Sequence, residues 1–279
     1  MKFLRFSLAW LVLAALSLCR AAAALPLQHG EHLSFKVNWA IMPGAGSIKI
    51  DAIADPAAPD ARIMVTTTTS TRRFARMLMP FDAKAESLFD LKTGKLISLH
   101  ETSTQRDKKN EHTVKFDHAR RVATYLVPGD AEPPRALPIP AGDPVDLIVA
   151  LLQTRTWNLK IGESQDALVL FDDDFYELTI HAVRHEEVST PLGRFKTLVL
   201  EPRMDKTPPK GMFKKGSSVR VWIAQDDQRL PVKFEVEFKI GTGTATLDAY
   251  EPPAALRGAK APAKPAGASS TPDAKNSRP

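Results

Sequence analysis

The stretch RLPVKFEVEFKI, residues 229–240, decides the fold class. Its large apolar residues occupy every second position from Leu230 to Ile240, with Pro231 and then lysines and glutamates between them. In a β-strand this alternation directs the apolar side chains to one face, against a core, and the charged ones to water. Runs with the same period of two occur at 31–40 and 176–182. Such repeated runs indicate a sheet with one buried face.

A further alternating run at 219–223 places Trp222 opposite to Val221 and Ile223, which predicts a partly exposed tryptophan. About a dozen short strands, without the rhythm of βαβ units, predict an all-β fold, mainly antiparallel. The expected architecture is a curved sheet or a barrel-like single domain. Turn residues separate the runs at Pro43-Gly44-Ala45-Gly46, Asp55-Pro56, Thr93-Gly94, Asp172-Asp173-Asp174, Pro191-Leu192-Gly193 and Asp226-Asp227.

One buried helix near 143–156 interrupts the strand pattern. Asp143 is the expected N-cap, Pro144 the first helical residue and Asp146 the acidic residue of the first turn. The helix is apolar on most of its surface, so we expect it to cover one face of the sheet. The Pro-rich stretch 128–144 before it predicts a long connection.

The N-terminal stretch 1–24 has a basic start, an apolar segment that ends at about Leu18, and four alanines. This pattern predicts a cleaved signal peptide and a periplasmic location, because the apolar segment is too short to span a bilayer. Cys19 is the only cysteine, and the bulky Leu18 before it argues against lipoprotein anchoring. One cysteine also excludes an internal disulfide and a thiolate zinc cluster.

The net charge of +6 comes from the two ends of the chain. The leader contains three basic residues and no acid, and residues 251–279 contain five basic and two acidic residues. The body, 25–250, has 30 of each and is neutral, which argues against nucleic acid as a partner. Residues 252–279 are rich in Pro, Ala and Lys and predict a disordered tail after a β-rich domain at 25–251.

Sequence motifs of catalysis are missing: there is no GxSxG, HExxH or P-loop pattern. His181 and His185 lie on one predicted strand, which separates them by roughly 13 Å, too far to share a metal ion. We therefore predict no catalytic residue, no metal and no cofactor. A catalytic triad assembled by folding stays open.

Four aromatic residues are candidates for ligand contact, because large rings supply contact area at a small cost in entropy. The alternative is packing in the core or at its rim. The four are Trp39, Trp157, Tyr176 and Trp222.

Two stretches that combine basic and apolar residues are candidates for contact with anionic lipid or a partner. The alternative is a strand with snorkelling arginines and an ordinary hairpin loop. The first stretch, 72–81, offers Arg72, Arg73, Phe74 and Arg76. The second, 206–216, is a predicted mobile loop with Met212 and Phe213 at its tip, beside Lys214 and Lys215.

The order of several short motifs resembles the domain-of-unknown-function family 3108 (DUF3108), proteins of the bacterial envelope, over residues 29–250. The resemblance implies an exported, β-rich single domain from bacteria with an outer membrane, and it supplies no catalytic residues. The motifs are Gly30-Glu31, Trp39, Gly46, Asp143 to Arg155, Gly162, Thr190-Pro191-Leu192-Gly193-Arg194-Phe195, Val221-Trp222-Ile223-Ala224-Gln225-Asp226, Pro231-Val232 and Ile240-Gly241.

The expected function is that of a non-enzymatic periplasmic β-protein that binds an amphiphilic or envelope component, as lipid carriers do. The alternatives are a scaffolding partner of an envelope complex, which would use sheet edges and the tail, and a hydrolase of cell wall or lipid. Its partner would be a lipid or an envelope protein, and no transmembrane span is expected in the mature chain. The sequence leaves the ligand and the oligomeric state open.

Overall fold

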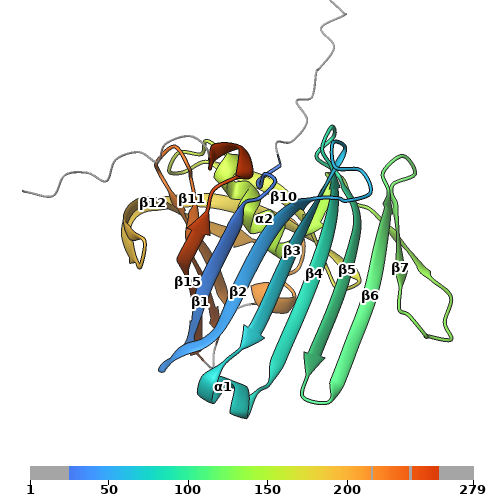
Figure 1. The fold of residues 1–279 in the computed structure, drawn as a ribbon, viewed down its shortest axis with the longest axis horizontal. Helices are drawn as coiled ribbons and strands as arrows, with labels where there is room; N and C mark the ends of the chain where they lie inside the picture. Colours follow the sequence, from blue (N-terminus) through green and yellow to red (C-terminus); the bar gives the residue numbers. More distant parts are fainter. Residues whose placement is uncertain (1–24, 215, 239–240, 258–279) are drawn as a thin grey trace, which may run out of the picture.

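A computed structural model describes residues 25–214, 216–238 and 241–257. In these ranges fifteen strands form one sheet, in the order β8 to β1 and then β15 back to β9. Two meanders therefore make up most of the sheet, and they join where β1 pairs with β15; β9 is added in parallel at the outer edge of the second. Figure 1 shows the sheet strongly curved, with α2 behind it on the concave side. The predicted all-β, mainly antiparallel curved sheet is confirmed, and the sheet is not closed.

The first meander contains β1 (His32–Trp39), β2 (Met42–Ala54), β3 (Arg62–Thr71), β4 (Phe81–Asp90), β5 (Leu96–Gln105), β6 (Lys108–Asp117), β7 (Val122–Leu126) and β8 (Arg135–Pro138). The second contains β9 (Pro144–Asp146), β10 (Ser164–Phe171), β11 (Asp174–Thr190), β12 (Gly193–Arg203), β13 (Ser218–Ala224), β14 (Pro231–Phe238) and β15 (Gly241–Glu251). The helical segments are α1 (Arg73–Leu78), α2 (Leu147–Gln153) and the 3₁₀ turns η1 (Thr154–Thr156), η2 (Gly211–Phe213) and η3 (Ala254–Leu256).

The alternation that predicted β14 matches its burial. Val232 and Phe234 are buried, whereas Lys233 and Glu235 on the other face are half-buried. The ring of Phe234 lies 5.0 Å from that of Phe35, centroid to centroid, on β1. This contact lies inside the curve of the sheet and packs the two meanders against each other.

The buried helix is present, but its predicted start is wrong. Pro144 is extended in β9 and pairs in parallel with Leu168 of β10, so a βαβ connection occurs here. Asp146, not Asp143, is the N-cap of α2, and its side chain accepts a hydrogen bond of 2.9 Å from the backbone N–H of Val149. Both aspartates suit a cap; the pairing of β9 with β10 keeps the chain extended until Asp146.

The Pro-rich stretch 128–144 is also more structured than predicted. It contains β8 and leads directly into β9, the two edge strands of the sheet. Prolines are tolerated on edge strands because no neighbour there needs their missing N–H group.

The first hairpin turns at Ala40 and Ile41, so the turn predicted at Pro43–Gly46 is wrong. Gly46 lies inside β2, where a Cβ atom would come within 2.7 Å of the carbonyl oxygen of Ser70. This glycine therefore permits a close approach of β2 and β3 and does not form the turn.

We expect Gly46→Ala to lower the free energy of unfolding by about 1–3 kcal/mol, because the added methyl group must push two backbones apart. Urea unfolding of this variant against Lys49→Ala, an exposed change on the same strand, measures the effect. Equal stability of the two variants would contradict the packing argument.

The predicted leader at 1–24, with Cys19, and most of the predicted tail lie outside the described residues. At the other end, η3 follows the predicted boundary at 251, and the N–H of Ala254 donates to the carbonyl of His29. Ordered structure thus extends to Arg257, and the rest of the predicted tail is not described.

Candidate functional site

Burial along the concave face falls from one end of the strands to the other. On β1, Leu33 and Phe35 are fully buried, whereas Val37 is half-buried. On β4, Phe89 is fully buried and Ala83, on the same face, is half-buried. The buried end is the one that α2 covers, since the helix contacts β9 and β10 and four of its residues are buried. The α1 end of the concave face is therefore the less covered part of the sheet (Figure 1).

Trp39 lies on this less covered part. It pairs with Gly243 of β15, and a Cβ atom on Gly243 would come within 3.0 Å of the tryptophan ring. The ring thus rests on the glycine backbone and is half-buried. Of the four aromatic candidates, Trp39 is the one that the fold places on the less covered part of the concave face.

The less covered concave face is apolar on one side and polar on the other. Val37 and Ile48 supply apolar side chains from β1 and β2. Across the sheet, the same face of β5 and β6 carries Glu101 and His112, whose carboxylate oxygen and Nε2 lie 3.2 Å apart. His112 is nearly buried and stacks on Tyr125, with ring centroids 5.0 Å apart. Small residues, Ala83 and Ala85 among them, separate the two sides.

Polar contacts bridge the two edges of the sheet beside this face. The hydroxyl of Tyr125 on β7 donates to Asp172 in the β10–β11 turn at 3.0 Å. Arg135 on β8 forms an ion pair of 2.6 Å with Asp173 in the same turn. Burial, and then the hydrogen bond to Asp172, raise the pKa of Tyr125 to about 12, so the phenol stays protonated and donates. The predicted hairpin turn at Asp172–Asp174 is confirmed, and its role is to link the sheet edges.

Asp146 is fully buried at the deep end of the concave face. Ser87 on β4 donates a hydrogen bond of 2.6 Å to its second carboxylate oxygen. Burial raises the pKa of Asp146. The hydrogen bonds from Ser87 and from the backbone of Val149 lower the pKa, but their effect is smaller than that of burial. A serine nucleophile needs a base that is free to accept its proton. Asp146 is instead engaged as a helix cap, so the pair holds α2 against β4.

The other three aromatic candidates lie elsewhere and do not share one site with Trp39. Tyr176 is buried on the concave face of β11. Trp157 is half-buried after η1, where its carbonyl accepts a hydrogen bond of 2.6 Å from Arg229. Trp222 faces away from Val221, as predicted, but its expected partial exposure is wrong, because only 2% of it is accessible.

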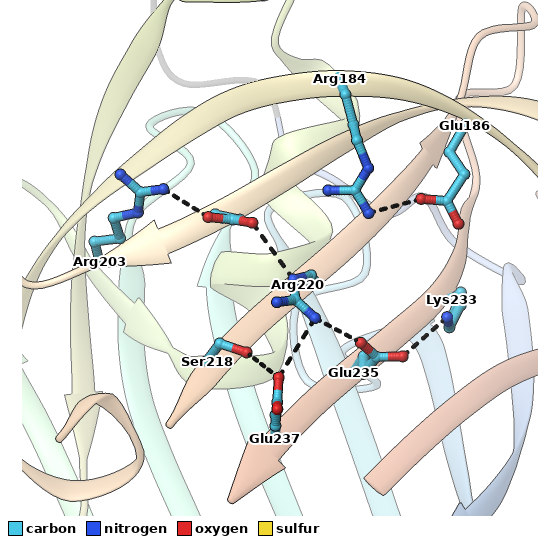
Figure 2. Close-up of polar contacts among 9 residues, drawn as sticks. Arg184, Glu186, Arg203, Ser218, Arg220, Lys233, Glu235 and Glu237 are labelled. Atoms are coloured by element: carbon cyan, nitrogen blue, oxygen red, sulfur yellow. Dashed lines mark hydrogen bonds and ion pairs between the residues drawn. The ribbon is translucent and has the colours of Figure 1, made fainter. Parts of the chain in front are cut away.

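Lys233 covers Trp222, with its ammonium 4.0 Å from the ring centroid. Figure 2 shows the charged network around this lysine on the outward face of β11 to β14. At its centre Arg220 approaches Glu235 at 2.9 Å, and Glu201 and Glu237 at longer distances. The four basic and four acidic residues of the network compensate one another. This face is therefore saturated with internal pairs and offers little to a charged ligand.

The loop 206–214 folds back onto the protein. Phe213 lies in η2 and packs against Tyr176, with ring centroids 6.3 Å apart, and both Phe213 and Met212 are half-buried. Lys210 lies over the same tyrosine, 4.4 Å from its centroid. Lys214 is exposed, and Lys215 lies outside the described residues. The contacts hold the apolar part of this loop against the body.

The stretch 72–81 contains the short helix α1 (Arg73–Leu78) and ends at the first residue of β4, so the alternative of a strand throughout is wrong. Arg72, Arg73, Phe74 and Arg76 are all exposed. Arg76 makes a two-pronged ion pair with Asp82, at 2.9 and 2.7 Å. The structure thus separates the two basic–apolar stretches: the first projects from the sheet and the second packs onto it.

Sequence reasoning overlooked Glu101 and His112. A usable signal existed, because Glu101 follows the buried Leu99 at a spacing of two and so falls on the concave face. A charged residue at such a position marks either a paired or a functional group.

The family model "Protein of unknown function (DUF3108)" matches residues 34–248 of the chain. The chain belongs to the DUF3108 family. This confirms the resemblance seen in the motifs. No curated protein matches the sequence of this DUF3108 member.

A solved structure shares the fold of this DUF3108 chain. A β-barrel-like protein of family DUF1849 from Brucella abortus matches with a TM-score of 0.51 and 7% identity, over 81% of this chain and 99% of that one. A candidate exported protein with a YmcC-like fold from Bacteroides fragilis matches with a TM-score of 0.27 and 12% identity, over 82% and 99% of the two chains. At such identities the first match shows a common β-barrel-like fold and nothing more.

Proposed function

We propose that this DUF3108 protein is an exported, non-enzymatic binding protein that holds an amphiphile on the less covered part of its concave face. One observation carries the proposal: at the α1 end this face is half-buried, with apolar residues on β1 and β2 and a carboxylate–imidazole pair on β5 and β6. An amphiphile has the same division between an apolar and a polar part. Sites for small molecules are concave and mostly apolar, with a few polar groups that orient the ligand.

Trp39 contributes most to the apolar side of the proposed site. Its ring comes so close to Gly243 that a Cβ atom there would be 3.0 Å from it, and the side chain is half-buried. A fixed aromatic ring binds acyl or ring systems without losing much side-chain freedom.

The proposed location is the periplasm, with residues 1–24 acting as a cleaved signal peptide. In the described ranges none of the helices has the length and apolar character needed to cross a membrane. Export to the envelope would place the protein where membrane amphiphiles are its neighbours.

Ala83→Trp tests the site, because it fills the concave face at its half-buried end. Both proteins are purified without detergent and analysed by native mass spectrometry. We expect a retained amphiphile on the wild type and at least about tenfold less on the variant, because the indole ring would occupy the space of the ligand. Lys84→Trp adds the same ring to the other face of the same strand and should keep the ligand. A bare wild-type protein, or equal retention by both variants, contradicts the proposal.

The two alternatives find less support in the geometry. A hydrolase would need a nucleophile beside a free base, whereas Ser87 donates to the buried helix cap Asp146. A scaffold that adds a partner strand would use an edge such as β8, which is four residues long and ends in Pro138. Short edges with proline oppose strand addition.

A further inference from the structure

Five large apolar side chains gather at the α1 end of the sheet and remain exposed. Ile41 at the tip of the β1–β2 hairpin is 95% accessible, and Met77 on α1 is 79% accessible. Phe74, Leu78 and Met79 complete the group, each more than half accessible. Monomeric proteins seldom leave such a group in water without a binding role.

The backbone holds these residues together at one rim. Helix α1 packs against β2, and the N–H of Arg72 donates to the carbonyl of Ala45 at 2.7 Å. On the other side, the N–H of Arg106 in the β5–β6 turn donates to Pro80 at 3.1 Å. Figure 1 shows α1 projecting below the sheet, between the tips of β1–β2 and β5–β6. The five side chains therefore lie at one end of the sheet, on α1, on the residue after it and at the neighbouring hairpin tip.

Cations surround the apolar group. The side chains of Arg73 and Lys36 both lie beside Gly44. A Cβ atom on this glycine would be 3.4 Å from the side chain of Arg73 and 3.6 Å from that of Lys36. Among the described residues, no carboxylate forms an ion pair with Lys36, Arg72, Arg73 or Arg106. Arg76 of α1 pairs with Asp82, and on the outward face Arg184, Arg203 and Arg220 pair with glutamates. We call these four cations and the five apolar residues the rim patch.

The charge at this end contrasts with the neutral body. Segments 36–44, 70–84 and 104–110 together hold eight basic and two acidic residues, although 25–250 as a whole has equal numbers of each. Basic residues therefore outnumber acidic ones at this end of the sheet, and the rest of the body holds the compensating acidic residues. A surface of this sign attracts anions, and its apolar centre requires a partner with a hydrocarbon interior.

We propose that the rim patch docks the protein onto the surface of an anionic lipid bilayer. Ile41, Phe74 and Met77 would enter the headgroup region, and the unpaired cations would lie over lipid phosphates. A nucleic acid would complement the positive charge of the rim patch, but it has no hydrocarbon interior that could bury the exposed apolar side chains. The inference deepens the proposed function, since docking at this rim would bring the open end of the concave face to the membrane.

Vesicle co-sedimentation tests the docking, using purified protein expressed from the full chain. Vesicles of phosphatidylcholine and phosphatidylglycerol in equal parts should bind the wild type, and vesicles of phosphatidylcholine alone should bind it weakly. We expect the triple variant Arg72→Glu, Arg73→Glu, Arg106→Glu to lose about a hundredfold in affinity for the anionic vesicles. The double variant Phe74→Ser, Met77→Ser should lose about tenfold, because it removes the inserted apolar groups.

Matched controls change the same kinds of residue elsewhere. Lys92→Glu, Arg120→Glu, Lys160→Glu gives the same change in net charge outside the rim patch, and Ile161→Ser, Leu256→Ser removes two other exposed apolar residues. Both should bind the anionic vesicles like the wild type. Far-ultraviolet circular dichroism confirms that each variant is folded.

Three results would overturn the docking: a wild type that does not bind the anionic vesicles, controls that lose as much as the rim variants, or binding that depends on the arginines and not on Phe74 and Met77. The last would indicate a general polyanion site. Failure of docking and failure of amphiphile binding are distinguishable. Retained amphiphile without vesicle binding refutes only the docking, and vesicle binding by a bare protein refutes only the proposed ligand site.

Discussion

Arg155→Ala is expected to lower the free energy of unfolding by about 3–5 kcal/mol, because it leaves a buried charge without its partner. Glu31 is 2% accessible, and its carboxylate lies 2.5 Å from the guanidinium of Arg155. The same guanidinium donates to the carbonyls of Pro26 and Gln228, and the hydroxyl of Tyr250 donates to Glu31. One side chain thus ties the start of the domain to the segment after α2 and to the β13–β14 turn.

Thermal and urea unfolding measure this effect. For a domain of this size, such a loss corresponds to a fall in Tm of roughly 10 °C. Arg203→Ala is the matched control, since Arg203 pairs with Glu201 at the surface and its loss should cost at most about 1 kcal/mol. The double variant Glu31→Gln, Arg155→Met removes both charges and should recover part of the loss. An Arg155→Ala variant as stable as the control would contradict the role of this pair.

Asp146→Ala is expected to cost about 2–4 kcal/mol, the sum of a lost N-cap and an unsatisfied buried hydroxyl. The carboxylate accepts from Val149 at the start of α2 and from Ser87 on β4, and both contacts are buried. Asp146→Asn keeps an acceptor for Val149, and the Ser87 hydroxyl can rotate to accept from the amide, so it should cost less than about 1 kcal/mol.

The raised pKa of Asp146 also predicts that the stability of the wild type depends on pH. Burial raises the pKa of Asp146 above its ordinary value of 3.8, so the native state binds this proton more tightly than the unfolded state. The stability of the wild type relative to Asp146→Asn should therefore rise as the pH falls through the raised pKa, and level off below the ordinary one. Urea unfolding of both proteins across this range measures the difference. A constant difference would mean that the pKa of Asp146 is not raised.

The local pattern of residues was sufficient for the general architecture. Alternation in 229–240 follows from the geometry of a strand alone, so it identified β14 and its buried face without knowledge of its neighbours. The hairpin turn at Asp172–Asp174 and the apolar helix after Pro144 also follow from short-range preferences. The order of the motifs indicated the family.

The less covered concave face could not be predicted in the same way. Glu101 and His112 face each other because β5 pairs with β6 in one register, and Trp39 rests on Gly243, two hundred residues away in the sequence, because β1 pairs with β15. Lys233 and the neighbouring strands bury Trp222 on a face that alternation alone assigns to water. No single segment contains these pairings.

The sequence by itself determined the all-β fold, the neutral charge of the body and the basic–apolar character of the stretch 72–81, since each depends on residue type and spacing. Only the tertiary structure decided which aspartate caps α2, where the concave face is left less covered, and which of the basic–apolar stretches projects into solvent. The physical reason is the distance along the chain over which each effect acts. Periodicity acts between neighbours in the chain, whereas burial and pairing depend on which distant strands the curved sheet brings together.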